Sequence, residues 1–150
     1  MDPLHIATAV PNDYEWCATV MASSEPWLTL GRDLEQCRAA LRRPGTQLFV
    51  ARDNAPPAGF ILIAPYGLAG SPYVASIAVA EEARGKGIGS QLLAFAEAHF
   101  AAQGHMFLLV SSFNSRAQEL YRRHGYQCVG ELKDYIVPGH SELLLHKRIS

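Results

Sequence analysis

The stretch EEARGKGIGSQLLAFAEAH, residues 81–99, places three glycines at alternate positions just before an apolar segment of helical period. Glycine inside a helix costs about 0.5–1 kcal/mol relative to alanine, so Gly85, Gly87 and Gly89 do not favour the helix that follows. Their placement after a predicted strand and before a predicted helix indicates that something approaches the backbone closely there. The identity of that group decides both the fold and the function.

The start of this helix is suited to bind a phosphate group. The first backbone N–H groups of a helix have no intrahelical partner, and the helix dipole is positive at that end. Positions without side chains let an anion reach these amides, and Arg84 and Lys86 add positive charge. We therefore predict that residues 84–89 hold a phosphate. The alternative is a glycine-rich loop that only makes a tight turn.

The glycine spacing argues against two common phosphate-binding motifs. A Walker loop needs GxxxxGK[ST], whereas Lys86 is followed by Gly87 and no such frame precedes it. A dinucleotide fingerprint needs GxGxxG, and here the three glycines form GxGxG. A nucleotide-phosphate enzyme is therefore the least favoured interpretation of the loop.

Length and composition predict one globular domain over residues 1–150. The chain is 49% hydrophobic and 18% charged, with a net charge of −1, which argues against a general nucleic-acid binder. No apolar run approaches the roughly 20 residues of a membrane span, and the N-terminus lacks the pattern of a signal peptide. Three widely spaced cysteines and six histidines show no metal-ligand spacing. We expect reduced, mostly buried cysteines, no metal, no membrane and a cytoplasmic protein.

The predicted elements alternate as in an α/β domain around a mixed sheet. A turn at 53–57 separates two of the strands, Asn12 or Asp13 caps the first helix, and the apolar run at 105–112 is typical of a central strand covered on both faces. We predict strands over 4–9, 46–52, 58–65, 73–80, 105–112, 126–137 and 141–149, and helices over 12–24, 32–45, the second half of 81–99, and 114–125.

Two motifs resemble those of the GNAT superfamily of N-acyltransferases. Residues 84–89 fit its acetyl-CoA-binding pattern R-x-x-G-x-G, between SIAVAEEA and SQLL. The stretch LLVSSFNSRAQELYRRHGYQCVG, residues 108–130, is similar to the later motif N-xx-A-xx-LY-xx-x-GF, with Tyr126 in the aromatic position. The resemblance implies a single α/β domain with a mixed, mostly antiparallel sheet of about seven strands, a splayed central parallel pair, and helices on both faces.

The resemblance also implies acetyl-CoA as co-substrate and assigns residues to it. Ile77, Ala78 and Val79 would offer backbone groups to the pantetheine arm, as if the arm extended the sheet. Asn114 would contact the pantetheine, unless it only caps its helix. The pyrophosphate would be held by Arg84, Gly85, Lys86, Gly87, Ile88, Gly89 and Ser90.

Tyr121 occupies the position of the family's general acid, which protonates the departing CoA thiolate; alternatively it is only a core aromatic. A phenol with a pKa near 10 can donate a proton without being ionised at neutral pH. Leu109 stands where relatives that acetylate a ribosomal N-terminal alanine carry a glutamate, so the base is left unassigned. The candidates to supply it or to hold a water are Ser111, Ser112, Glu81, Glu82, Glu25 and Glu142.

These implications predict acetyl transfer to a primary amine by direct attack in a ternary complex. Both a protein N-terminus and a small-molecule amine remain open as acceptor, and Trp27 and Tyr135 either line its pocket or pack beneath a loop. The alternative function is a non-catalytic acyl-CoA-binding or sensing module, which Leu109 motivates. A homodimer is compatible with the resemblance, although no stretch specifies an interface.

Overall fold

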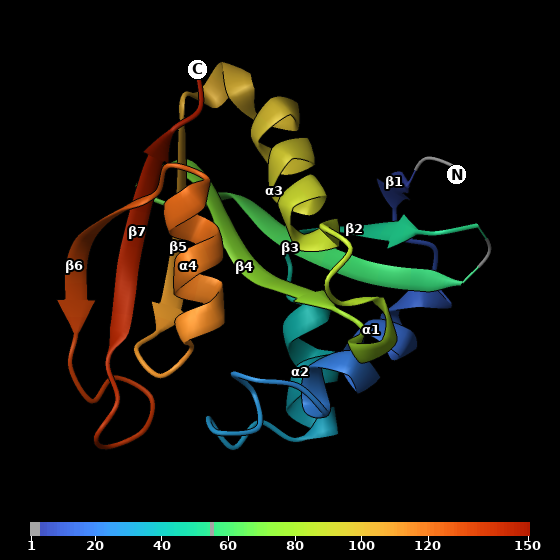
Figure 1. Ribbon diagram of the computed structural model, residues 1–150, viewed down its shortest axis with the longest axis horizontal. Coiled ribbons are helices and arrows are strands. Elements are labelled where there is room, and N and C mark those ends of the chain that lie inside the picture. The colour runs from blue at the N-terminus through green and yellow to red at the C-terminus, as the bar shows by residue number, and fades with distance from the viewer. Residues whose placement is uncertain (1–3, 55) are drawn as a thin grey trace.

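A seven-stranded sheet with the order β1-β2-β3-β4-β5-β7-β6 forms the centre of the protein (Figure 1). The computed structural model describes residues 4–54 and 56–150; residues 1–3 and Ala55 of the predicted 53–57 turn lie outside this description. The strands are β1 (His5–Thr8), β2 (Gln47–Arg52), β3 (Pro57–Leu68), β4 (Ser71–Val79), β5 (His105–Ser111), β6 (Gln127–Leu132) and β7 (Glu142–Arg148). The helices are α1 (Asp13–Ala22), α2 (Leu34–Leu41), α3 (Ile88–His99) and α4 (Ser115–Arg123), with short 3₁₀ turns at Glu81–Ala83 and Ala101–Gln103.

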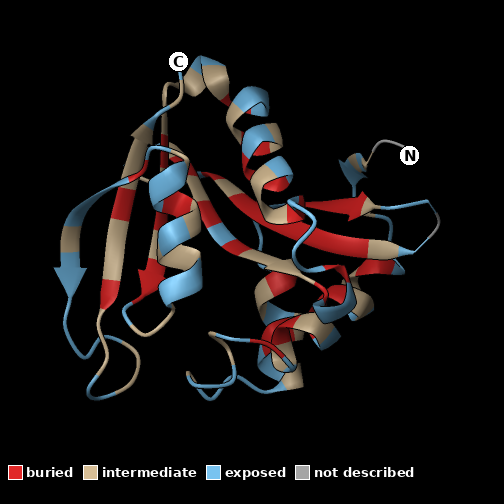
Figure 2. Ribbon diagram, viewed as in Figure 1, coloured by how far each residue is buried: buried red, intermediate tan, exposed pale blue. Residues whose placement is uncertain are grey.

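Strict alternation along β2 and β3 places helices on both faces of the sheet. Successive strand residues point to opposite faces. One set packs with α1 and α2 and comprises Leu48, Val50, Phe60 and Leu62. The other set packs with α3 and α4 and comprises Phe49, Ala51, Ile61 and Ile63. Figure 2 shows these buried residues running along the central strands, while β6 at the sheet edge is largely exposed.

The parallel pair β4–β5 is short. Ladder pairing between the two strands joins only Tyr73 to Phe107 and Val74 to Leu108, although β4 continues to Val79 and β5 to Ser111. All other neighbouring strands pair antiparallel. The predicted mixed sheet with a splayed parallel pair is therefore confirmed.

The two faces of β5 are covered unequally, which differs from the prediction for 105–112. Met106, Leu108 and Val110 are buried against α3 and α4. On the opposite face, Phe107 and Leu109 are only half-buried. Leu109 lies directly after Leu108, the last residue of β5 that pairs with β4.

Two strand boundaries differ from the predicted ones because of turn geometry. β3 continues beyond Pro65 to Leu68, because a two-residue turn with positive φ at Ala69 and Gly70 connects it directly to β4. β6 ends at Leu132 rather than at residue 137, since Asp134 has a positive φ and its side chain accepts a hydrogen bond from the Gly139 amide.

The first helix begins at the predicted place but without a side-chain cap. Asn12 is its N-cap residue and makes no capping hydrogen bond. The Asp13 carboxylate instead accepts a hydrogen bond from the Val10 amide and pairs with Arg52 of β2. In α2, by contrast, Asp33 and Gln36 form a complete capping box.

Candidate active site

Two clefts meet where β4 and β5 separate. One, of about 780 Å³, runs along the glycine loop and the start of α4 and is called here the glycine-loop cleft. The other, of about 700 Å³, lies between the Trp27 segment, α2 and the ends of β5 and β7 and is called the Trp27 cleft. Both are lined by the same five residues at their junction, which are Glu25, Ile77, Asn114, Ala117 and Tyr121.

The three glycines of the loop are needed for two different reasons. Gly85 and Gly87 have φ of +82° and +77°, and a Cβ on either would meet nothing within 4 Å. Their left-handed backbone therefore requires glycine, and the space above them is open. At Gly89, a Cβ would lie 3.3 Å from Leu120 Cδ2, so this glycine allows α3 and α4 to approach each other.

Three arginines and two glutamates, Glu25 and Glu81, line the glycine-loop cleft, and only one of the two cations expected from the sequence is among them. Arg84 lines it and donates hydrogen bonds of 3.3 Å to the Val79 carbonyl and to Ser24 Oγ. Lys86 is exposed and is not among the lining residues. Arg116 and Arg123 of α4 line the cleft instead. Their separation of seven residues places them on one side of the helix. This spacing is the feature of the sequence that could have identified them as residues of the cleft.

The outer edge of β4 offers backbone groups to the junction. Ile77, Ala78 and Val79 pair with β3 on one side, whereas the ladder to β5 ends at Val74. A register shift at Ala75 bends the strand at the same point. The backbone of residues 75–79 is therefore not paired with β5, as a ligand that extends the sheet would require.

Tyr121 lies at the junction of the two clefts. It is 5% exposed and packs edge-to-face on Tyr126, with ring centroids 6.1 Å apart. Burial raises the pKa of its phenol above the ordinary value, and the nearby Tyr73 adds to this effect. The hydroxyl thus stays protonated at neutral pH. Tyr121 belongs to the core and also lines both clefts, and its role as general acid stays a prediction.

Asn114 begins α4 and faces both clefts. Its side-chain oxygen accepts a hydrogen bond of 3.3 Å from the Ala117 amide, so its role as a helix cap is clear. A contact with a ligand stays a prediction for this residue. Ile88 is buried in the core below the loop, and both Ile88 and Ser90 line the glycine-loop cleft. Their contact with a pyrophosphate stays a prediction.

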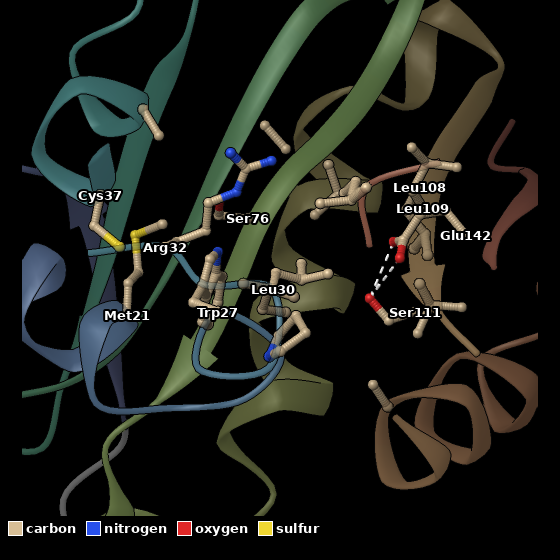
Figure 3. A pocket seen from close by; sticks show the side chains of 18 of the residues that line it. Met21, Trp27, Leu30, Arg32, Cys37, Ser76, Leu108, Leu109, Ser111 and Glu142 are labelled. Carbon is tan, nitrogen blue, oxygen red and sulfur yellow. Dashed lines mark hydrogen bonds between the residues drawn. The ribbon is translucent and has the colours of Figure 1, made fainter. Parts of the chain in front are cut away.

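Glu142 and Ser111 form a buried polar pair in the Trp27 cleft (Figure 3). Ser111 Oγ donates toward both carboxylate oxygens, at 3.0 and 2.8 Å. Burial raises the pKa of Glu142, against the lowering effects of the Ser111 hydrogen bond and of His140. The sequence suggested both residues separately but carried no signal that they pair, because 31 positions separate them.

The other candidates for the base are placed less favourably. The Glu25 carboxylate is engaged by the amide and hydroxyl of Thr29, at 2.9 and 2.8 Å. Ser112 is exposed, and its Oγ accepts a hydrogen bond from the Ser141 amide. Glu81 lines the glycine-loop cleft rather than the Trp27 cleft, and Glu82 lines neither.

Of the two aromatic residues considered for an acceptor pocket, Trp27 lines the Trp27 cleft and Tyr135 does not. Trp27 is half-buried and faces the Trp27 cleft together with Leu30 and Arg32 (Figure 3). Tyr135 is 62% exposed and does not line the cleft, whereas its neighbour Ile136 does.

The cysteines are free thiols, with Cys17 and Cys37 buried and Cys128 exposed. Within residues 4–54 and 56–150, no group of three or more potential metal ligands occurs. In the same ranges, none of the helices combines the length and apolar character needed to cross a membrane.

The sequence profile of the Acetyltransferase (GNAT) family matches residues 9–126. The chain belongs to this family. No curated protein sequence matches it significantly. The GNAT assignment agrees with the fold, because similar solved structures cover almost the whole chain.

Three of these structures illustrate the similarity. A Desulfovibrio desulfuricans protein assigned to the GNAT acetyltransferases has a TM-score of 0.84 at 18% identity, covering 99% of this chain and 100% of its own. The ribosomal-protein-S18-alanine N-acetyltransferase of Escherichia coli has a TM-score of 0.78 at 16% identity, covering 99% and 95%. An aminoglycoside 6′-N-acetyltransferase in complex with coenzyme A has a TM-score of 0.78 at 16% identity, covering 97% of each chain. At these identities the similarity concerns the fold.

Proposed function

We propose that this GNAT protein transfers an acetyl group from acetyl-CoA to a primary amine by direct attack in a ternary complex. The observation that carries the proposal is the meeting of the two clefts at Tyr121. One cleft has the features of a phosphate-binding site, and the other is a separate, partly apolar cavity that ends beside the same residue. Two substrates entering from opposite sides would meet there.

The residues of the glycine-loop cleft fit acetyl-CoA. The open space above Gly85 and Gly87 lies at the start of α3, where backbone amides and the helix dipole favour a pyrophosphate. Arg84, Arg116 and Arg123 would neutralise phosphate charge. The edge of β4 at residues 77–79, which is not paired with β5, would bind an extended amide-containing arm in the manner of an added strand.

Tyr121 would act as the general acid. As the new C–N bond forms and the thioester C–S bond breaks, the phenol gives its proton to the departing sulfur. Its raised pKa keeps that proton in place before the transfer. Proton transfer by a positioned side chain contributes typically about 10²–10⁴-fold to the rate.

Direct attack fits the placement of the thiols better than an acyl-cysteine does. Cys37 is the one cysteine that lines the Trp27 cleft among the described residues, and it is only 1% exposed. Burial raises the pKa of its thiol, which keeps it in the unreactive protonated form.

The acceptor is a primary amine that enters the Trp27 cleft. Of two structural relatives, one is named for a protein alanine and the other for an aminoglycoside. Both acceptor classes therefore occur on this fold, and we propose a peptide N-terminus and a small-molecule amine as the two classes to assay.

The first test is a thermal-shift titration with acetyl-CoA, free CoA and ATP in parallel. A ligand at 100 times its Kd stabilises a fold by about 2.7 kcal/mol, which is several degrees for a domain of this size. We expect both CoA species to raise the Tm and ATP to leave it unchanged. No shift with millimolar CoA would contradict the proposal.

The second test separates the enzyme from a non-catalytic acyl-CoA-binding module. A panel of amines and peptides is incubated with acetyl-CoA, and release of free thiol is measured for the wild type and for Tyr121→Phe. The enzyme predicts turnover that falls about 10²–10⁴-fold in the variant with unchanged CoA binding. CoA binding without turnover of any amine would favour the binding module.

A further inference from the structure

The Trp27 cleft contains the carboxylate of Glu142, to which the acetyl transfer described above assigns no role. Glu142 is 5% exposed and Ser111, its direct partner across the β5–β7 ladder, is 1% exposed. A buried carboxylate normally pairs with a cation. Among the described residues, no lysine or arginine forms an ion pair with Glu142.

We propose that Glu142 is the general base that takes the proton of the acceptor amine, with the Ser111 hydroxyl fixing its carboxylate. This inference rests on the proposed function, because it assigns a role within that reaction. Glu142 on β7 would supply the proton-accepting carboxylate that β5 lacks, because position 109 on β5 is a leucine.

The ladder between β5 and β7 explains how Glu142 can act in place of a glutamate at position 109. Leu109 pairs with Leu144, and Ser111 pairs with Glu142. Residues 109 and 111 point to the same face, because side chains on a strand alternate. Glu142 is thus the diagonal neighbour of Leu109, and such neighbours lie about 7–8 Å apart at their backbones, within reach of a long side chain.

Tyr73 connects the proposed base to the proposed acid. This half-buried tyrosine of β4 lines the Trp27 cleft, and its pKa is raised to about 12 by burial and then by the charge of Glu142. Tyr73 in turn contributes to the raised pKa of Tyr121. Glu142 and Tyr121 therefore both lie close enough to Tyr73 to interact with it electrostatically.

The charged and titratable groups around Glu142 leave it available to accept a proton. His140, from the turn before β7, lowers its pKa, and Ser111 of β5 donates to it. Tyr73 faces it from β4, while Tyr135 and Arg43 act on Tyr73 itself. On β6, the Glu131 carboxylate accepts a hydrogen bond from Ser141 Oγ at 2.6 Å.

The proton balance of the step is simple. The ammonium of the acceptor gives one proton to a Glu142 oxygen, and the neutral nitrogen attacks the thioester carbon. As the C–S bond breaks, the sulfur takes the proton of Tyr121. The nitrogen then loses a second proton, which restores the Tyr121 phenol, so the products are a neutral amide, a free thiol and a protonated Glu142. At pH 7, freeing a lysine-like amine of pKa about 10.4 costs about 4.6 kcal/mol, whereas an α-amine near 7.7 costs about 1 kcal/mol. A base raised in pKa by burial is better matched to either amine than an exposed carboxylate.

The experiment compares Glu142→Gln, Ser111→Ala and the control Glu119→Gln with the wild type, using the amine that the wild type acetylates fastest. Glu119 is an exposed glutamate on α4, paired with Arg122. For Glu142→Gln we expect kcat to fall about 10²–10⁴-fold at pH 7 with an unchanged CoA-induced thermal shift. Its remaining rate should rise steadily with pH as the free amine becomes available.

For Ser111→Ala we expect a smaller loss, with the acidic limb of the kcat–pH profile moved to higher pH. Removing a hydrogen bond from a carboxylate disfavours its charged form, and a merely structural role of Ser111 would not move that limb. Glu119→Gln should behave as the wild type.

The outcomes separate this proposal from the proposed function. If Glu142→Gln folds, binds CoA and retains the wild-type kcat, Glu142 is not the base although the protein is an acetyltransferase. If Glu142→Gln does not fold, an unmoved acidic limb in Ser111→Ala overturns the assignment. A wild type that binds CoA but transfers no acetyl group to any amine overturns both proposals.

Discussion

The Tyr126 hydroxyl donates a hydrogen bond of 2.9 Å to Glu97 Oε2. The other carboxylate oxygen of Glu97 accepts a hydrogen bond of 2.7 Å from Lys147 Nζ. Glu97 lies on α3 and Lys147 on β7, so this one carboxylate connects the helix to the last strand of the chain. Tyr126 also supports the ring of Tyr121.

The Tyr126→Phe substitution should destabilise the fold. It removes a hydrogen bond to a charged acceptor, and such bonds contribute about 1.5–3 kcal/mol. Urea denaturation would measure the free energy of unfolding. As a control, Tyr66→Phe at a tyrosine that is 75% exposed should change it by less than about 0.5 kcal/mol. Equal effects of the two variants would contradict the role given to Glu97.

The Gly87→Ala substitution should weaken CoA binding as well as stability. An alanine at φ +77° costs about 1–2 kcal/mol, and its methyl group would occupy the open space above the loop. We expect the CoA affinity to fall about tenfold, or 1.4 kcal/mol, in the thermal-shift titration. Gly70→Ala, in the β3–β4 turn at φ +78°, should cost the same stability and leave CoA affinity unchanged.

The kcat of the wild type should not decline between pH 7 and about pH 10. A general acid stops working when it loses its proton, and burial moves that loss for Tyr121 above the ordinary phenol pKa. kcat measured from pH 7 to pH 10 at saturating acetyl-CoA would show this. A decline near pH 9 that disappears in Tyr121→Phe would show that the phenol ionises earlier than its burial predicts.

Glu142→Gln should be at least as stable as the wild type at pH 8, and relatively less so at pH 4. The pKa of Glu142 is raised in the folded protein, so the fold favours its protonated form. The stabilising contribution of that form is present below the unfolded pKa and is lost as pH rises through the folded pKa. Tm values of both proteins across pH 4–8 would test the sign. A variant that loses most stability at pH 8 would contradict it.

The fold was predictable from the sequence because its signals are local and repeated. The alternation in 47–52 and 58–63 defines two buried faces, and the motifs at 84–89 and 114–126 fix the order of the last elements. The end of β6 was not predictable, because the conformation of Asp134 depends on a hydrogen bond from Gly139.

The sequence allowed the candidate site to be proposed on the side of the glycine loop and much less completely on the opposite side. Residues 77–79 and 84–90 adjoin one another in the sequence, so one motif identifies them together. The Ser111–Glu142 pair forms only through the register of β5 and β7. Likewise, the half-burial of Trp27 depends on packing against α1 and α2, and the composition of its own segment does not determine it.

The two-pair contact between β4 and β5 has a consequence for how the molecule moves. Strands β1–β4 form one ladder and β5–β7 another, and between them the sheet is continuous only at Tyr73 and Val74. A molecule bound along residues 75–79 would form backbone hydrogen bonds with β4 where β5 does not. It would thereby hold the two parts of the sheet in a fixed relative position. The backbone amides of residues 75–79 should therefore exchange with solvent faster without a ligand than with one. Slower exchange on binding would show that the two parts of the sheet have become one rigid body.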